Sequence, residues 1–167
     1  MTVVQYCTPE WLEESARCYA AEPRFQKEFA GISAKPLKLA FRVKAEPAWG
    51  IEKDLIFGAV VEQGKLMELT FYNEEQAKKD VNFFLSATPQ EWKRLLRKQT
   101  KFIGVVMLKK VIVEHGDFAS LLKLAPHGDA FVDALTQVTL QFPDEMSPEE
   151  LTQYKAYQKE FRNKLGV

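Results

Sequence analysis

The stretch that decides the fold is residues 80–124, DVNFFLSATPQEWKRLLRKQTKFIGVVMLKKVIVEHGDFASLLKL. Its first part, residues 81–87, is rich in residues of high β propensity and predicts a strand. Thr88 and Pro89 then predict a helix start, because a hydroxyl caps free amides and proline suits the first helical position. The periodicity of residues 102–108 fits a strand and a helix equally well. Residues 111–113 predict a further strand.

The stretch closes with a turn and a second helix. Gly116 ends the strand, and Asp117 is the expected cap of a helix over residues 118–124. Apolar residues spaced by three and four predict another helix from residue 129 to about residue 138. The predicted order is therefore strand, helix, ambiguous segment, strand, helix, helix.

Upstream of this stretch, the apolar residues alternate with polar ones. Residues 37–43, 55–61 and 67–71 each repeat this pattern, which is typical of strands with one wet face. A tight turn at Gln63-Gly64 joins the second and third, so they predict a three-stranded antiparallel meander. Residues 73–80 are expected to be a polar connection.

Three helices are predicted by the same opening, a hydroxyl residue before proline. Thr8, Thr88 and Ser147 supply it, and a short helix is also expected after Pro23. Residues 141–144 are the most linker-like segment of the chain. The helix beyond them carries an apolar stripe and could pack on its own domain, bind a partner or cover a cavity mouth.

The composition narrows the function. The chain of 167 residues carries 23 basic and 23 acidic residues, and this balance argues against general nucleic-acid binding. The 12 Phe residues indicate a thick apolar interior, either solid or hollow. Neither a signal peptide nor an apolar run long enough to span a membrane is present, so we expect a cytoplasmic protein.

The order of elements and residues 80–124 resemble the sterol carrier protein type-2 family of lipid-binding domains, in its bacterial stand-alone form. The likeness rests on Phe83-Phe84, the Ser86-Ala87-Thr88-Pro89 helix start, and the run from Lys109 to Asp117. The openings at Thr8-Pro9-Glu10-Trp11 and Pro23-Arg24-Phe25 agree with it. The chain departs from the family in lacking a glycine before Lys109 and in placing His115 before the turn.

The resemblance implies an α+β fold: a five-stranded, mostly antiparallel sheet covered on one face by helices, with an apolar cavity between them. It implies a lipid-binding domain over residues 1–140, followed by a linker and an extra C-terminal helix over 141–167. The expected function is non-catalytic binding or transfer of a fatty acyl chain, a sterol-like lipid or an isoprenoid, with no cofactor. The candidate ligand-binding residues are Phe84, Trp92, Leu95, Phe102, Val106, Met107, Val111, Val113, Leu122, Phe131 and Leu135.

Catalytic candidates are few. His115 and His127 each precede Gly-Asp, a string that is common in turns and helix caps. An enzyme acting on a hydrophobic substrate through either histidine is an alternative, and so is a metal site that joins them to Asp117 and Asp129. We expect neither a catalytic nor a metal site, because the sequence has no nucleophile or metal-ligand motif.

Partners are suggested by a basic cluster and by the last helix. The basic side chains could contact an anionic membrane surface transiently or form a solvated helix face. The alternative function is a structural module, a homodimer or an enzyme-partner subunit without a dedicated ligand. No nucleic acid is expected. The basic cluster consists of Lys93, Arg94, Arg97, Lys98 and Lys101.

Overall fold

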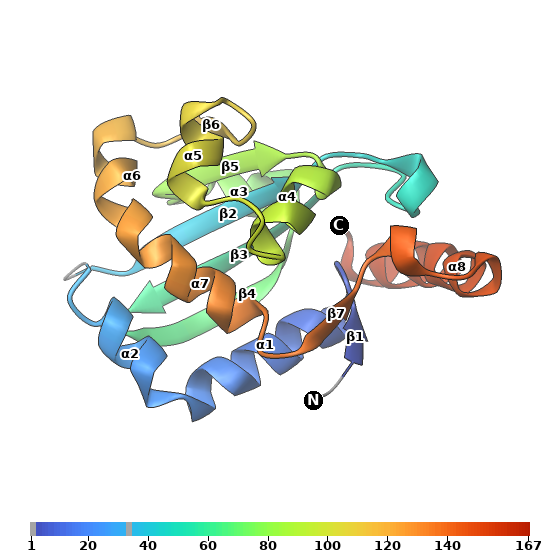
Figure 1. Cartoon of the computed structure of the whole chain (residues 1–167), viewed down its shortest axis with the longest axis horizontal. Coiled ribbons are helices and arrows are strands. Elements are labelled where there is room, and N and C mark those ends of the chain that lie inside the picture. Colours follow the sequence, from blue (N-terminus) through green and yellow to red (C-terminus); the bar gives the residue numbers. More distant parts are fainter. Residues whose placement is uncertain (1–2, 33–34) are drawn as a thin grey trace.

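A five-stranded sheet forms the centre of the molecule (Figure 1). This computed structural model describes residues 3–32 and 35–167. The strand order is β4-β3-β2-β5-β6; β2 and β5 are parallel and the other neighbours antiparallel. The mixed, mostly antiparallel sheet confirms the predicted fold class. The strands are β2 Leu37–Val43, β3 Leu55–Glu62, β4 Lys65–Tyr72, β5 Phe83–Ala87 and β6 Ile112–His115.

Strict alternation along β2 separates the two faces of the sheet. Leu37, Leu39, Phe41 and Val43 all point into the main core, as their spacing predicts. Across the ladder, Phe41 lies opposite a core residue on either side, Phe57 of β3 and Leu85 of β5. One register therefore builds a continuous apolar face across the middle of the sheet.

Four helices cover this face: α1 Pro9–Ala21, α2 Pro23–Phe29, α4 Pro89–Leu96 and α7 Gly128–Leu135 (Figure 1). The predicted caps are confirmed, since Thr8 accepts from the Trp11 amide and Thr88 from the Glu91 amide. Two indoles tie the layers together. The Trp11 Nε1 donates to Leu135 O and the Trp92 Nε1 donates to Arg42 O, each at 2.9 Å.

The ambiguous segment is a helix, α5 Phe102–Met107. It leads to β6 and then to α6 Phe118–Leu124, whose amide at Ser120 is capped by Asp117 as predicted. A 3₁₀ turn, η2 Ala125–His127, joins α6 to α7. Helix α7 ends at Leu135, three residues before the predicted end at Val138, and the Thr136 hydroxyl donates back to Val132 O at its end.

The opposite face of the sheet has a smaller cover. The expected polar connection contains a short helix, α3 Glu74–Lys78. A capping box between Asn73 and Gln76 stabilises the start of this helix. Beneath it lies a second apolar cluster. Next to that cluster Arg42 reaches from β2 to three carboxylates, those of Asp54, Glu74 and Glu114. The second cluster consists of Ala40, Ile56, Tyr72, Ala77, Val81 and Phe84.

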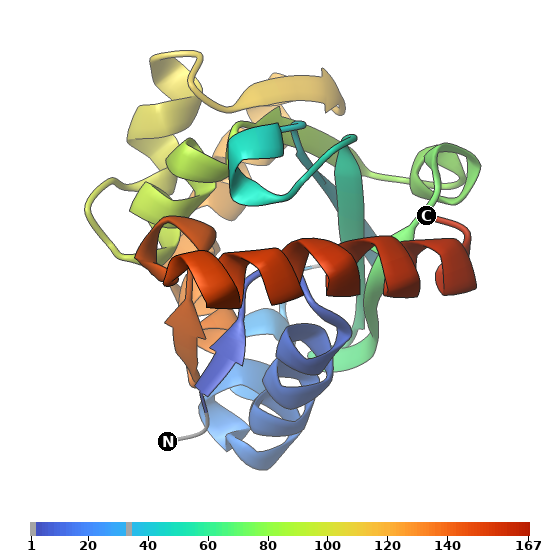
Figure 2. The same cartoon turned by 90° about the vertical axis from the view of Figure 1, so that its right-hand side faces the viewer.

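The last helix, α8 Pro148–Leu165, lies across the end of the molecule that holds the N-terminal strand (Figure 2). Of the roles left open for it, packing on its own domain is confirmed. The Tyr154 hydroxyl donates to Tyr6 O, and Gln158 Nε2 donates to Cys7 O at 2.8 Å. Phe161 packs on Phe71, with ring centroids 5.4 Å apart.

A second, two-stranded sheet joins the segment before α1 to the segment between α7 and α8. Strand β1 Val3–Gln5 pairs in parallel with β7 Thr139–Gln141, and the sequence patterns did not predict either strand. The predicted linker, residues 141–144, therefore contains the last residue of β7 and the start of a 3₁₀ turn, η3 Pro143–Glu145. A further 3₁₀ turn, η1 Pro47–Trp49, precedes β3. The division at residue 140 stays a sequence-based prediction, and residues 1–2 and 33–34 of its first part lie outside the described residues.

None of the helices in the described part of the chain is long and apolar enough to cross a membrane.

Candidate functional site

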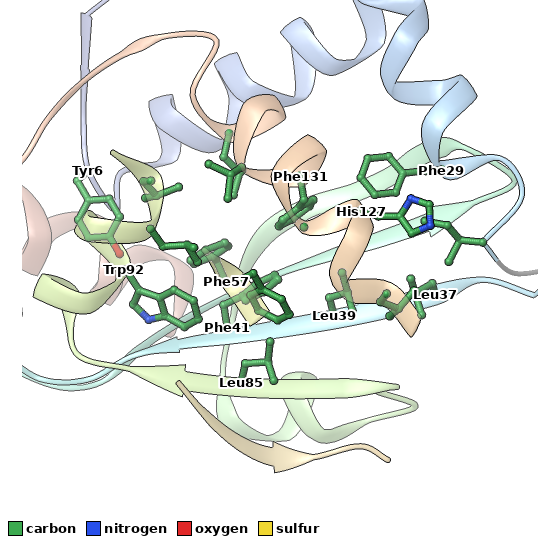
Figure 3. A pocket seen from close by; sticks show the side chains of 18 residues that line it. Tyr6, Phe29, Leu37, Leu39, Phe41, Phe57, Leu85, Trp92, His127 and Phe131 are labelled. Carbon is green, nitrogen blue, oxygen red and sulfur yellow. The ribbon is translucent and has the colours of Figure 1, made fainter. Parts of the chain in front are cut away.

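A small apolar cavity lies between the sheet and α7 (Figure 3). It has a volume of about 90 Å³. Residues of β2, β3 and β5 form its floor, and residues of α4, α6 and α7 with their neighbours form the roof and walls. The lining consists of Tyr6, Phe29, Ile32, Leu37, Leu39, Phe41, Phe57, Leu85, Trp92, Leu95, Leu96, Phe102, Leu124, His127, Gly128, Phe131, Val132 and Leu135.

The floor is set by strand alternation. Leu37, Leu39 and Leu85 point from the strands toward α7 in Figure 3. Between floor and roof, the ring of Phe41 stacks on Phe57 and on Phe131, with centroids 5.1 and 5.4 Å apart. The Phe41–Phe131 contact therefore joins the sheet to α7 directly at the cavity.

Two residues with polar groups mark opposite ends of the cavity (Figure 3). At one end Tyr6 is fully buried beside the Cys7 thiol, and burial raises its pKa well above the ordinary value, so the phenol is neutral. At the other end His127 is partly exposed, and its Nδ1 lies 2.9 Å from Glu28 Oε1. The space between them is almost wholly apolar, which suits a ligand without polar groups along its length.

The structure brings five of the predicted ligand-binding residues together at this cavity. They come from three separate helices and would not be neighbours without the fold. The five are Trp92, Leu95, Phe102, Phe131 and Leu135.

The other six predicted residues lie outside the lining. Phe84 points to the opposite face, because its neighbours Phe83 and Leu85 occupy the core face and side chains alternate along a strand. Met107 and Leu122 are exposed to solvent. The remaining three pack in or against the main core at the foot of α5 and on β6: Val106, Val111 and Val113.

None of the strand residues that form the floor was in the predicted set. The alternation over residues 37–43 could have indicated Leu37, Leu39 and Phe41, because it already assigned them to one face of the sheet. No local pattern could have indicated Tyr6, whose place depends on a strand pairing with residues 139–141.

Neither histidine is part of a recognisable catalytic device. His127 contacts Glu28 and the ring of Phe29, while His115 lies on β6 and is exposed. Within residues 3–32 and 35–167, no three His, Cys, Asp or Glu side chains are grouped as metal ligands. Cys7 is fully buried, and burial raises the pKa of its thiol, so it is protonated and poorly nucleophilic.

The basic cluster of residues 93–101 is engaged within the molecule. Each of its five side chains has a carboxylate partner: Lys93 with Asp144, Arg94 with Glu91, Arg97 with Glu145, Lys98 with Asp133, and Lys101 with Asp129. These ion pairs leave the basic cluster little uncompensated positive charge with which to attract an anionic membrane surface, the contact that the sequence predicted.

Comparison with known proteins found no matching family profile and no matching curated sequence. Solved structures do match. A conserved hypothetical protein from Thermus thermophilus, described as possibly a sterol carrier protein, superposes with a TM-score of 0.68 at 16% identity, covering 80% of this chain and 90% of that one. A crystal structure of sterol carrier protein 2 gives 0.67 at 17% identity, covering 79% and 98%.

The fold is that of sterol carrier protein 2. Nearly the whole length of that protein is matched, so the sheet and its helical cover are shared as one unit. At this identity the likeness establishes the sterol carrier protein 2 fold and leaves the function to be argued from the site.

Proposed function

We propose that this protein binds a hydrophobic ligand in the cavity between the sheet and α7, without catalysing a reaction on it. The ligand class is a fatty acyl chain, a sterol-like lipid or an isoprenoid. The observation that supports this most is the lining, which is almost wholly apolar and is built by residues from eight separate stretches of the sequence. The matched protein that carries the name sterol carrier protein 2 supports the same class.

The cavity must widen when a ligand enters. Its volume is about 90 Å³, whereas sites for molecules of this class enclose roughly 300–1,000 Å³. The sheet is fixed by continuous hydrogen-bonded ladders on both sides of β2, so the helical side has to yield. Movement of α7 together with α6 separates Phe131 from Phe41 and opens space along the floor.

The polar group of the ligand lies at the His127 end in this proposal. That end is partly exposed, whereas the Tyr6 end is sealed by full burial. A polar head group retains water there while the tail fills the apolar interior, where each buried CH₂ group contributes about 0.8 kcal/mol.

A filled cavity provides the test. Leu39→Trp places a larger side chain on the floor and is expected to weaken binding of a fluorescent fatty acid at least about tenfold, or about 1.4 kcal/mol. Overpacking costs about 1–3 kcal/mol of stability, so urea unfolding must first show that the variant is folded. Val60→Trp, on the opposite face of the neighbouring strand, is the matched control and should bind like the wild type.

Native mass spectrometry and organic extraction of the purified protein give a second readout. A co-purifying lipid that is present in the wild type and in Val60→Trp, and lost in Leu39→Trp, supports the proposal. Absence of any lipid, together with no binding of fluorescent fatty acids at micromolar concentration, overturns it.

The small volume of the cavity also favours one rival function, an interaction module whose interior is an ordinary core. Such a module would form a dimer or join an enzyme and would need no ligand. Light scattering of the full chain distinguishes the two: a stable dimer with no lipid bound supports the module, and a lipid-loaded monomer excludes it.

A further inference from the structure

Exposed apolar side chains gather at one end of the molecule. Among the described residues nine large apolar side chains are exposed, and six of them fall between residues 103 and 122. The other three, Val3, Met67 and Leu165, are scattered, which is ordinary for a protein surface. The six, which we call the α5–α6 patch, are Ile103, Met107, Leu108, Ile112, Phe118 and Leu122.

The patch has the geometry of two adjoining helical stripes. Ile103 and Met107 are four residues apart on α5, and Phe118 and Leu122 are four apart on α6, so each pair lies on one helix face. Ile103 and Leu122 line the same shallow groove, which brings the two stripes together. Figure 1 shows α5, β6 and α6 grouped at the end of the molecule away from α8.

Three lysines lie beside the patch. Lys109 and Lys110 follow α5 directly, and their side chains form no hydrogen bond or ion pair with any residue that the structure describes; Lys123 lies in the last turn of α6. Two of the nearby acids have a basic partner, and the third, Asp117, lies within electrostatic reach of Lys123. Glu114 binds Arg42, Asp117 accepts from Ser120 at the start of α6, and Asp129 lies 3.8 Å from Lys101.

One side chain borders both the patch and the cavity. Phe102, the first residue of α5, lines both the cavity and the groove shared by Ile103 and Leu122. It packs closely on α7, since a Cβ added to Gly128 would lie 3.2 Å from the Cβ of Phe102. Displacement of Phe102 would therefore connect the groove directly to the apolar interior.

We propose that the α5–α6 patch docks on the surface of an anionic lipid bilayer, where the ligand passes between the bilayer and the cavity beside Phe102. Apolar side chains flanked by lysines are the combination that enters the head-group region and attracts anionic lipids. An anionic bilayer is the occupant that matches both features of this surface, the exposed apolar side chains and Lys109 and Lys110 beside them. The passage of ligand rests on the proposed function; the docking can be measured separately.

The experiment uses the full chain and vesicles of equal parts phosphatidylglycerol and phosphatidylcholine, with pure phosphatidylcholine for comparison. Co-sedimentation should show binding to the anionic vesicles that falls with added salt. Lys109→Glu/Lys110→Glu is expected to weaken it at least about 30-fold, since each lysine near such a surface contributes about a factor of five. Met107→Ser/Leu108→Ser removes apolar contact and should weaken it to a similar extent.

Matched controls keep the comparison sharp. Met67→Ser removes a methionine of similar exposure on β4, and Lys159→Glu/Lys164→Glu makes the same change of charge on α8. Both controls should bind vesicles like the wild type. Equal binding by patch and control variants, or no binding by the wild type, overturns the proposal. So does a dimer in light scattering that the patch variants abolish, since it would show a second copy on this surface.

A vesicle-free measurement separates this proposal from the function on which it rests. The patch variants leave the cavity lining intact, so their affinity for a fluorescent fatty acid in solution should equal that of the wild type. Intact fatty-acid binding without vesicle binding overturns only the docking surface. Vesicle binding by a wild-type protein that binds no fatty acid overturns the cavity function and leaves the docking.

Discussion

Helix α8 and the α5–α6 region are both amphipathic, yet they are attached to the fold in different ways. The side chains of α8 hydrogen-bond to distant backbone carbonyls: Gln158 donates to Cys7 O, and Arg162 donates to Lys53 O and Asp54 O at 2.8 and 2.6 Å. Helices α5 and α6 bury only Val105, Val106 and Leu121 between them.

The difference shows how one molecule can have a fixed end, at α8, and an end that rearranges more easily, at α5 and α6. Buried hydrogen bonds to distant carbonyls hold a helix in one position, because leaving such a carbonyl unpaired costs about 1–3 kcal/mol. A helix with few buried apolar contacts opens at a lower free energy. The two regions should therefore respond differently to substitution.

The largest effect is expected at the fixed end. Phe161→Ala removes a buried ring that packs on Phe71 and Tyr157, and should lower the free energy of unfolding by about 3–5 kcal/mol. Urea denaturation measures it. Leu165→Ala, an exposed position on the same helix, is the control and should change the value by less than about 0.5 kcal/mol. Equal effects at the two positions would show that α8 is not integral to the core.

An intermediate loss of stability is expected on substitution of Arg42, whose ion pair with Glu114 links β2 to β6, the strand that leads to α6. Arg42→Met removes the guanidinium, and with it the cation–π contact with Phe84 and the ion pairs to Asp54, Glu74 and Glu114, at a cost of about 1–2 kcal/mol. The hydrogen bond from Arg42 holds the pKa of Glu74 below its ordinary 4.5.

This pKa shift fixes the pH dependence of the Arg42 effect. Because the folded-state pKa of Glu74 is the lower one, its stabilisation is complete above pH 4.5 and is lost as the pH falls through the folded-state value. Urea denaturation of wild type and Arg42→Met should therefore converge in acid. A stability difference that stays constant down to low pH would contradict the ion-pair explanation.

The smallest effect is expected in the α5–α6 patch. Phe118→Ser should change the free energy of unfolding by less than about 0.5 kcal/mol, because the side chain is already exposed. A loss of more than about 2 kcal/mol would show that this side chain is packed in solution, and would remove the contrast between the two ends.

The sequence predicted the elements that local chemistry determines. The hydroxyl-proline starts at Thr8, Thr88 and Ser147 are helix caps in the structure, and the alternation over residues 37–43 indicated the correct strand and face. These succeeded because capping and alternation depend only on near neighbours in the chain.

The features that the sequence missed depend on distant parts of the chain. Strands β1 and β7 are three residues each and gain their stability from each other, so neither has a pattern of its own. The prediction of the site residues also missed positions that depend on pairing with a distant strand. Phe84 and Leu85 are both apolar neighbours on one strand, and only the register with β2 decides that Leu85 faces the cavity and Phe84 the opposite side.

The pairing of β1 with β7 has a consequence for synthesis of the chain. Val3 lies opposite Thr139, and Tyr6 and Cys7 accept hydrogen bonds from α8. The carbonyl groups of Tyr6 and Cys7 are therefore synthesised 148 and 151 residues before the α8 side chains that bond to them. Because the nascent chain grows at about 5–20 residues per second, the N-terminal segment spends several seconds unpaired. During that interval Tyr6 and its apolar neighbours are a natural binding site for a chaperone.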